Sequence, residues 1–496
     1  MEVLGLIRSW RNTFSPINRT PTEVLTLIPD FWGRPGKEKA VIALTHVCRA
    51  WREVFTSRSS LWTVFDCLDG EKTRTYLERS KSSPINLRVD RDGGLSHQDP
   101  FLQIAPHAIS RLKYLTLGTR PDHLESFTNY LSLPAPILED LRIFGSNDDP
   151  FLNPTLTTTL FNGDLSSLRT FYLFSVCTEL PRRNMVNLTT FNLGYVLEPR
   201  VTIKQLLDFF ESAPYLLNVA LTFATPAFGA QNGRLVLLAH LRRLHIEGFH
   251  PPSLLLEHLL IPVGANMTID LDMPGPEIED HLPRSLDNLR NFPDFTKICL
   301  CFDQSASLKF IGPNGQVCLS STSPTPDTSL SLPRSLAQFD TSKAVWLEII
   351  GSDYLSEHLE HALLSLINLQ TLTLSLCERL YSFILALLPD PNSTNPIPCP
   401  KLKALILRTE ERFDIVTMVE VAATRASVGA PFNSVRVINC GEFVPREGVD
   451  ELMEHVSHVE TNYEINGEVY SLYGDDSDDE ELDEEGGSFG SGSGTP

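Results

Sequence analysis

The sequence predicts a mixed α/β protein in which a short helical module precedes a long array of strands and helices built on a parallel sheet. Three observations lead to this expectation. The chain has 496 residues, more than one ordinary domain needs. Residues 20–62 carry apolar side chains at helical spacing, and a Leu-x-x-Leu-x-Leu pattern then recurs along most of the remainder. Residues 474–496 are acidic at first and then rich in Gly and Ser.

Composition argues against several classes of protein. Hydrophobic residues make up 42% of the chain and charged residues 21%, which is typical of a globular protein. The sequence has no apolar run of about 18 residues, so we expect no membrane association. The net charge of −21 argues against nucleic-acid binding, which needs a basic surface. Nine cysteines without a paired framework and the lack of a secretory core predict a cytoplasmic or nuclear protein with free thiols.

The N-terminal region predicts three short helices. Thr20 can cap a helix, Pro21 fits its first position, and Glu23 can complete a capping box. The residues from Gly33 to Lys39 predict a charged loop, and a second helix is expected from about Lys39 to Ser57. Apolar residues cover more than half of this second helix, so that one side needs a partner outside the module.

The order of these residues resembles the F-box family. The resemblance spans residues 20–62, and the chain departs from the family pattern at Thr20 and in a longer loop after Gly33. The stretches that carry it are Thr20-Pro21-x-Glu23-Val24-Leu25-x-x-Ile28, Val47-Cys48-Arg49-x-Trp51-Arg52 and Leu61-Trp62. The following stretch, Tyr76 to Leu87, resembles F-box proteins that are expanded in mushroom-forming fungi.

The F-box resemblance implies that the module binds a Skp-type adaptor and, through it, a cullin ligase scaffold. The alternative for each apolar side chain is a place in the module's own core. The residues assigned to the adaptor contact are Pro21, Val24, Leu25, Ile28, Leu44, Val47, Cys48, Trp51, Leu61 and Trp62.

The remainder of the chain contains a degenerate repeat. The middle apolar position of its motif falls at Leu115, Leu141, Phe171, Phe191, Val219, Leu244, Ile269, Ile298, Val345, Leu372, Leu405 and Val435, with a further copy centred on Ile85. Successive positions lie 20–33 residues apart, except for one step of 47. That step contains a Ser/Thr/Pro-rich stretch, which we expect to be a surface insertion near residues 304–335. The pattern resembles leucine-rich repeats, which implies a solenoid with a parallel inner wall and outer helices.

These patterns divide the chain into six parts. We expect an N-terminal extension (1–16), an F-box (17–66), a linker with a first repeat or cap (67–110), a leucine-rich-repeat-like solenoid (111–462), an end segment (463–473) and a disordered acidic and Gly/Ser tail (474–496).

In a repeat of this kind, the residues between the motif leucines face the concave surface. That surface is the expected platform for a protein substrate, because aromatic and Arg residues dominate protein interfaces. The alternative for each aromatic residue is packing against a neighbouring repeat. The candidates are Arg142, Phe144, Tyr172, Phe174, His245, Asp270, Trp346 and Arg408.

The tail contributes much of the negative charge. Nine Asp or Glu residues lie between Gly474 and Glu485, and removing them from the total of −21 leaves −12 for the rest. Ser477 lies inside this acidic run and matches a site for a casein-kinase-type enzyme. The alternative interpretation is a tail that only keeps the protein in solution.

The sequence gives no catalytic or metal-binding constellation. It has no phosphate-binding Gly-x-x-x-x-Gly-Lys loop, no Gly-x-Ser-x-Gly elbow and no zinc-binding Cys/His array. A hydrolase or transferase is therefore disfavoured, and we expect no cofactor. The expected function is the non-catalytic substrate-recognition subunit of an SCF-type ubiquitin ligase; the alternative is an F-box scaffold that binds the adaptor without promoting ubiquitination.

Overall fold

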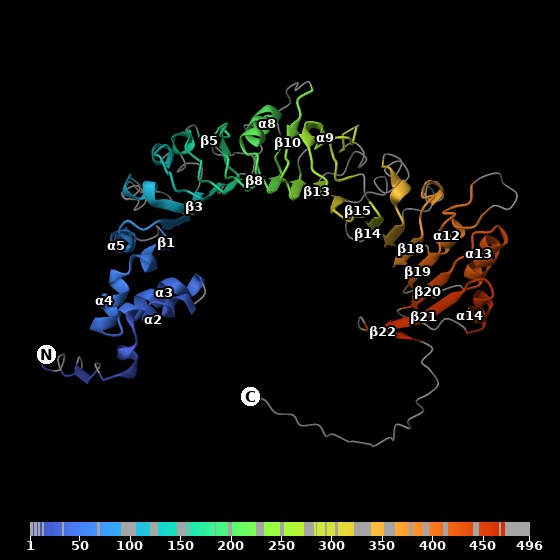
Figure 1. Ribbon diagram of the computed structural model, residues 1–496, viewed down its shortest axis with the longest axis horizontal. Helices are drawn as coiled ribbons and strands as arrows, with labels where there is room; N and C mark the ends of the chain where they lie inside the picture. Colours follow the sequence, from blue (N-terminus) through green and yellow to red (C-terminus); the bar gives the residue numbers. More distant parts are fainter. Residues whose placement is uncertain are drawn as a thin grey trace, which may run out of the picture. The chain divides into compact units, whose positions relative to one another are not determined.

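A computed structural model gives the fold of the protein (Figure 1). The residues that it describes are 3, 7, 10–11, 14–31, 34–66, 70–90, 106–119, 127–145, 155–156, 159–183, 185–196, 201–224, 233–248, 252–271, 282–283, 285–292, 295–302, 306–321, 339–351, 363–375, 380–389, 396–409, 415–439, 446–465 and 468–471. The chain divides into two compact units, Met1–Lys343 and Ala344–Pro496. The predicted mixed α/β class with a large, mostly parallel sheet is confirmed.

The first unit begins with helices and continues as a sheet. Its α-helices are α2 (Thr22–Leu25), α3 (Arg34–Thr45), α4 (Arg49–Ser57), α5 (Gly70–Ser80), α8 (Ile203–Ser212) and α9 (Ser253–Leu256). Its 3₁₀ helices are η1 (Pro16–Arg19), η2 (Ile28–Phe31), η3 (Ser59–Trp62), η4 (Ile109–Arg111), η5 (Leu160–Gly163) and η7 (Thr341–Lys343).

Within the described ranges, twelve strands form the main sheet of the first unit. In chain order they are β1 (Val64–Asp66), β2 (Ile85–Asp90), β3 (Leu112–Thr119), β4 (Asp140–Gly145), β6 (Thr170–Phe174), β8 (Thr190–Gly194), β9 (Asn218–Thr222), β11 (Arg243–Glu247), β13 (Asn266–Leu271), β14 (Lys297–Phe302), β15 (Ala306–Gly312) and β16 (Gly315–Ser321). The strands β1-β2-β3-β4-β6-β8-β9-β11-β13-β16 pair in that order, all in parallel. Strand β15 is antiparallel to both β16 and β14. Two smaller parallel pairs are β5 (Thr155–Leu156) with β7 (Cys177–Thr178), and β10 (Val236–Leu237) with β12 (Leu259–Leu260).

The predicted motif positions lie side by side in this sheet. Six of them pair in succession, in the order Leu115, Leu141, Phe171, Phe191, Val219, Leu244. Two predicted centres are wrong by two residues, because Leu87 pairs with Leu115 and Met267 pairs with Leu244. The residues Ile85 and Ile269, two positions away, lie on the same buried face of their strands, so the alternating pattern fits either register.

The predicted insertion near 304–335 is partly wrong. Residues Ala306–Gly312 and Gly315–Ser321 form the β15–β16 hairpin, and β16 takes the place beside β13 that a further repeat strand would occupy. Ile298, expected on a parallel repeat strand, lies on β14, whose partner β15 runs antiparallel to it. The remaining Ser/Thr/Pro-rich residues, 322–335, lie outside the described residues.

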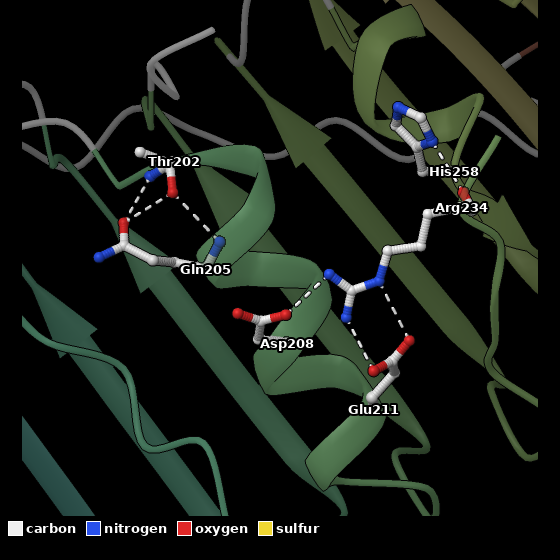
Figure 2. Close-up of polar contacts among 6 residues, drawn as sticks. All are labelled: Thr202, Gln205, Asp208, Glu211, Arg234 and His258. Carbon is white, nitrogen blue, oxygen red and sulfur yellow. Dashed lines mark hydrogen bonds and ion pairs between the residues drawn. The ribbon is translucent and has the colours of Figure 1, made fainter. Parts of the chain in front are cut away.

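The hydrophobic core of the sheet lies between the strands and the helices on one side of them, where Figure 1 shows α8 and α9. Phe191 is fully buried, with its ring centroid 5.9 Å from Phe171 on the next strand and 4.3 Å from Phe209 on α8. Helix α8 begins at a capping box in which the Thr202 hydroxyl accepts from the Gln205 amide (Figure 2).

Ion pairs from Arg234 connect the segment before β10 to helix α8. Its guanidinium lies 2.7 Å from Asp208 and 2.7 Å from Glu211, two carboxylates one helical turn apart (Figure 2). The carbonyl oxygen of Arg234 is 2.8 Å from Nδ1 of His258. Hydrogen bonds to the two carboxylates raise the pKa of Arg234 above its usual value, so the cation persists across the physiological pH range.

The described residues of the second unit form six strands of a sheet. Its strands are β17 (Trp346–Ile350), β18 (Thr371–Ser375), β19 (Ala404–Thr409), β20 (Ser434–Asn439), β21 (His458–Ile465) and β22 (Glu468–Ser471). Its helices are α12 (Leu380–Leu385), α13 (Ile415–Ser427) and α14 (Arg446–Met453). They lie on one side of the strands in Figure 1. Strands β17 to β21 are parallel and in chain order, and β22 is antiparallel to β21.

The register of the second unit confirms three predicted motif positions and corrects one. Leu372, Leu405 and Val435 pair in succession. Leu347, and not the predicted Val345, pairs with Leu372. Val459 on β21 continues the row after Val435, so the predicted end segment 463–473 begins inside a strand. The tail, residues 474–496 with Ser477, lies outside the described residues.

A buried cation holds the helical layer of the second unit together. Arg425 on α13 is 0% exposed and donates to the carbonyl oxygens of Leu387, Pro398 and Cys399 at 3.1, 2.8 and 3.0 Å. Its guanidinium also lies 4.9 Å from the ring centroid of Phe432. Burial lowers the pKa of Arg425, and burial raises the pKa of the Cys399 thiol to about 12.

The N-terminal helices differ from their predicted bounds. The predicted first helix is a single turn, α2, because Pro29 has no amide hydrogen to donate to Leu25, and the chain continues as η2. The predicted loop from Gly33 to Lys39 is helical from Arg34 onward.

The predicted helix from Lys39 to Ser57 is also wrong, because it breaks between α3 and α4. The break is at Cys48, which has an extended backbone (φ −157°). Arg52 of α4 donates to the carbonyl oxygen of Thr45 at 3.0 Å and so closes the end of α3.

Candidate functional site

The N-terminal helical module has a small aromatic core of its own. The Trp62 indole is 1% exposed and donates through Nε1 to the carbonyl oxygen of Phe55 at 2.8 Å. Its ring centroid is 4.9 Å from that of Tyr76, in an edge-to-face arrangement. The guanidinium of Arg79 lies 4.2 Å from the Trp62 ring centroid. These contacts join α4 and η3 to α5.

A second set of apolar side chains in this module is exposed. The exposed fractions are 50% for Val24, 51% for Leu27, 88% for Phe31, 37% for Ile42 and 56% for Val47. All five belong to the consecutive stretch that contains α2, η2, α3 and the turn after α3. Burying apolar area of this kind contributes about 25 cal/mol per Å² removed from water, so this stretch would gain from a protein partner.

The structure separates the ten residues predicted for the adaptor contact into two groups. Five are exposed or half-buried and stay candidates: Pro21, Val24, Ile28, Val47 and Cys48. The structure places the side chains of the five others in the chain's own core: Leu25, Leu44, Trp51, Leu61 and Trp62. The residues that the sequence analysis missed are Leu27, Phe31 and Ile42. The signal for them was present, since all three are apolar residues of the predicted helical module.

The second candidate surface is the sheet face opposite the helices of the first unit. Burial alternates along β6, where Phe171 and Leu173 are buried while Tyr172 and Phe174 are half-buried and face the other side. On β4 the Arg142 side chain is 48% exposed and forms a bidentate pair with Asp140, at 2.9 and 3.0 Å. This pair raises the pKa of Arg142 and leaves no net charge at that end of the face.

Five aromatic rings cross this face as a continuous row, which we call the aromatic track: Phe144, Tyr172, Phe174, Tyr195 and Phe223. Ring centroids are 5.1 Å apart for Phe144 and Tyr172, 6.3 Å for Tyr172 and Phe174, and 4.7 Å for each of the next two steps. Tyr195 is 37% exposed, and the other four are half-buried.

The same backbone turn follows three neighbouring strands and positions the last two rings of the track. Ser175, Tyr195 and Phe223 each follow a strand with φ near +50°, and their amides donate to the carbonyl oxygens of Gly194, Thr222 and Glu247 at 2.8, 2.7 and 2.6 Å. These residues sit in the left-handed region that disfavours L side chains.

Two glycines lie under the rings of the track. A Cβ at Gly194 would lie 2.8 Å from the Phe174 ring, and a Cβ at Gly248 would overlap the Phe223 ring. The absence of side chains at these two positions therefore lets the rings lie against the backbone of the next strand.

Two carboxylates lie on β11 and β13, the strands that follow the last ring of the track. His245 is 3.4 Å from Glu247 through Nε2 and 3.7 Å from Asp270 through Nδ1. Ser320 on β16 donates to Asp270. Burial raises the pKa of Asp270 and Glu247 raises it further, whereas His245 lowers it. We call His245, Glu247 and Asp270 the carboxylate cluster.

This cluster contains the residue types of a nucleophilic triad but not its geometry. A serine nucleophile needs its hydroxyl on the histidine, whereas the Ser320 hydroxyl donates to Asp270. The nearby Cys318 thiol has a pKa raised by burial, so it is protonated and weakly nucleophilic at neutral pH. The arrangement suits attraction of a cation more than activation of a nucleophile.

The predicted substrate-contact residues thus fall in two places. In the first unit, Arg142, Phe144, Tyr172 and Phe174 lie together, as do His245 and Asp270. In the second unit, Trp346 is 38% exposed and its Nε1 donates to Thr373 at 3.1 Å, while Arg408 is exposed on β19. Tyr195 and Phe223 were not predicted, because both follow their strands and fall outside the repeated motif.

No known family model matches this sequence, and no curated protein matches it. Of the helices in the described ranges, none combines the length and hydropathy needed to cross a bilayer. Among the same described residues, no three His, Cys, Asp or Glu side chains are grouped to hold a metal ion.

Proposed function

We propose that this protein is the substrate-recognition subunit of an SCF-type ubiquitin ligase. Its N-terminal module would act as an F-box that binds a Skp-type adaptor and, through it, a cullin scaffold. The remainder would be a leucine-rich-repeat-like solenoid that holds a protein target. Holding the target near a charged conjugating enzyme raises the effective concentration of its lysines, so the chain itself needs no catalytic group.

The observation that carries the proposal is that the N-terminal module has two groups of apolar side chains, one buried in its core and one exposed to solvent. Trp62 and Phe55 form a closed core, while Phe31, Leu27 and Val47 are at least half exposed. A module with a complete core has no structural need for these exposed side chains. An adaptor groove that covers them supplies a reason for their presence.

The solenoid part of the proposal is supported by the register of the strands. Equivalent buried positions recur every 20–33 residues and pair in parallel, from Leu87 to Met267 in the first unit and from Leu347 to Val459 in the second. This spacing overlaps the period of about 20–29 residues that is typical of leucine-rich repeats.

Co-purification of the full chain with a Skp-type adaptor tests the first step. The double variant Phe31→Asp with Val47→Asp places charges at exposed positions, so it should fold normally and lose at least tenfold in adaptor affinity. The matched control is Val186→Asp, because Val186 is 50% exposed but lies outside the module, just before β8. Equal adaptor binding by all three proteins would refute the assignment of this surface.

A reconstituted complex tests the second step and separates the ligase from a simple scaffold. With adaptor, cullin and charged conjugating enzyme present, we expect ubiquitin transfer to a protein that binds the repeat region. Adaptor binding without cullin recruitment or ubiquitin transfer would favour the scaffold instead.

A further inference from the structure

The aromatic track and the carboxylate cluster form one continuous strip of surface. The track begins on β4 and ends with Phe223 against Gly248, the residue that follows Glu247. The amide of Gly248 in turn donates to the carbonyl oxygen of Asp270, at 3.0 Å. From β4 to β13 the strip crosses five strand spacings, which is about 24 Å at about 4.8 Å per spacing. An extended chain of about seven residues covers that length.

The two ends of the strip differ in charge. At the β4 end, Arg142 and Asp140 neutralise each other. At the β13 end, Glu247 and Asp270 lie on either side of His245, and their side chains are 37% and 28% exposed. Arg243 is on the same strand face as Glu247 but four residues away, which is about 13 Å along the strand. Lys309, exposed on β15 two strands beyond β13, lowers the pKa of the Cys318 thiol but does not act on that of Asp270. The two carboxylates therefore leave the β13 end negative and accessible to a cation.

We propose that this strip binds an extended protein segment of about seven residues, whose apolar side chains contact the aromatic track and whose terminal Lys or Arg reaches Glu247 and Asp270. The aromatic faces attract apolar groups and cations alike. The carboxylates then fix the direction and register of the segment, because only its basic end is attracted to them. This inference rests on the proposed function in one respect: the segment would belong to the ligase target.

The same features disfavour two other ligands that stack on aromatic rings. A single-stranded nucleic acid would bring phosphates to the carboxylate cluster of a chain whose net charge is −21. A neutral oligosaccharide would use the rings but would gain nothing from Glu247 and Asp270. Dependence on a basic residue in the ligand is thus the property that separates a peptide from both.

Selection from a phage-displayed library of random heptapeptides tests the proposal on the full chain. We expect enriched sequences to combine three or more apolar residues with Lys or Arg at one end. Fluorescein-labelled versions of the enriched peptides are then measured by fluorescence polarisation, each against a matched peptide in which Gln replaces the basic residue. The basic peptide should bind at least fivefold more tightly than its Gln counterpart.

Variants of the strip locate the binding. Tyr195→Ala should weaken both peptides about tenfold, whereas Tyr215→Ala, a 53% exposed tyrosine outside the strip, should weaken neither. The double variant Glu247→Gln with Asp270→Asn should weaken the basic peptide about tenfold and abolish its advantage over the Gln peptide. The control Glu257→Gln removes an exposed carboxylate just after α9 and should change nothing.

Several outcomes would overturn the proposal: enrichment without basic residues, equal binding of the basic and Gln peptides, or binding unaffected by Tyr195→Ala. Binding of oligothymidylate or a neutral β-glucan that is lost in Tyr195→Ala would show that the strip serves another ligand class. Adaptor co-purification is measured on the same preparations. Peptide binding without adaptor binding would refute the ligase alone, and adaptor binding without peptide selection would refute the strip alone.

Discussion

Replacement of Arg425 by Met tests whether a buried cation held by backbone carbonyls stabilises the second unit. Met keeps most of the side-chain volume but removes the donor to two buried carbonyl oxygens, those of Leu387 and Pro398. The Cys399 carbonyl oxygen loses Arg425 too but still accepts from the Leu402 amide, at 3.0 Å. Each unsatisfied buried acceptor costs about 1–3 kcal/mol. Burying the Arg425 charge is itself unfavourable, as its lowered pKa indicates. Met carries no charge, so removing this penalty offsets part of the cost. We therefore expect a net loss of about 3 kcal/mol.

Differential scanning calorimetry of the full chain gives the measurement. For a unit of this size, about 3 kcal/mol corresponds to a fall of roughly 6–12 °C in the transition of the second unit. Arg425→Lys should fall between wild type and Arg425→Met, because Lys keeps the charge but not the planar fork. The control Arg408→Met, at an exposed position, should change stability by less than about 0.5 kcal/mol. A loss of less than about 1 kcal/mol in Arg425→Met would refute the reasoning.

Three further predictions concern single positions. Gly248→Ala should lower the free energy of unfolding in urea by about 1–2 kcal/mol, because φ is +57° and the added Cβ would overlap Phe223. The control Gly233→Ala, at φ +70° with open space around it, should lower that free energy by less. An equal loss in the two variants would count against the packing argument. Burial raises the pKa of Asp270, so the folded state holds more protons than the unfolded state between the two pKa values, and this carboxylate costs stability as the pH rises. Asp270→Asn should therefore match or exceed the wild-type melting temperature at pH 7 and lose that advantage near pH 4, and the opposite trend would contradict the assignment. The Cys399 thiol, with its pKa raised to about 12, should resist maleimide at pH 8 until urea is added, as followed by mass spectrometry, and rapid native labelling would contradict its burial.

Sequence patterns located the strands better than the helices. Val219 and Leu244 were predicted as motif centres and pair directly in the sheet, because alternation and a fixed step both constrain a strand. The helix predicted from Lys39 to Ser57 is broken at Cys48, and Arg52 after the break donates to the carbonyl oxygen of Thr45 at the end of α3. A contact between residues seven apart leaves no periodic signal in a sequence.

For the candidate surfaces too, the sequence predicted the exposure of some residues and not of others. Val24, Val47, Tyr172 and Phe174 were predicted to be accessible; the first two are at least half exposed and the two aromatic residues are half-buried. Trp51 was predicted to face a partner but is 7% exposed. A helix that is apolar over more than half of its circumference does not reveal in its sequence which side faces the core.

The amino-acid sequence by itself determined the mixed α/β class, the recurrence of strands and the alternation of buried and exposed residues, since these depend on spacing along the chain. Only the tertiary structure decided the register of Leu87, Met267 and Leu347, because a shift of two residues keeps every side chain on the same face. It also decided that Tyr195 and Phe223 join the aromatic track, since their left-handed turns and the carboxylates beside them come together only when distant strands pair.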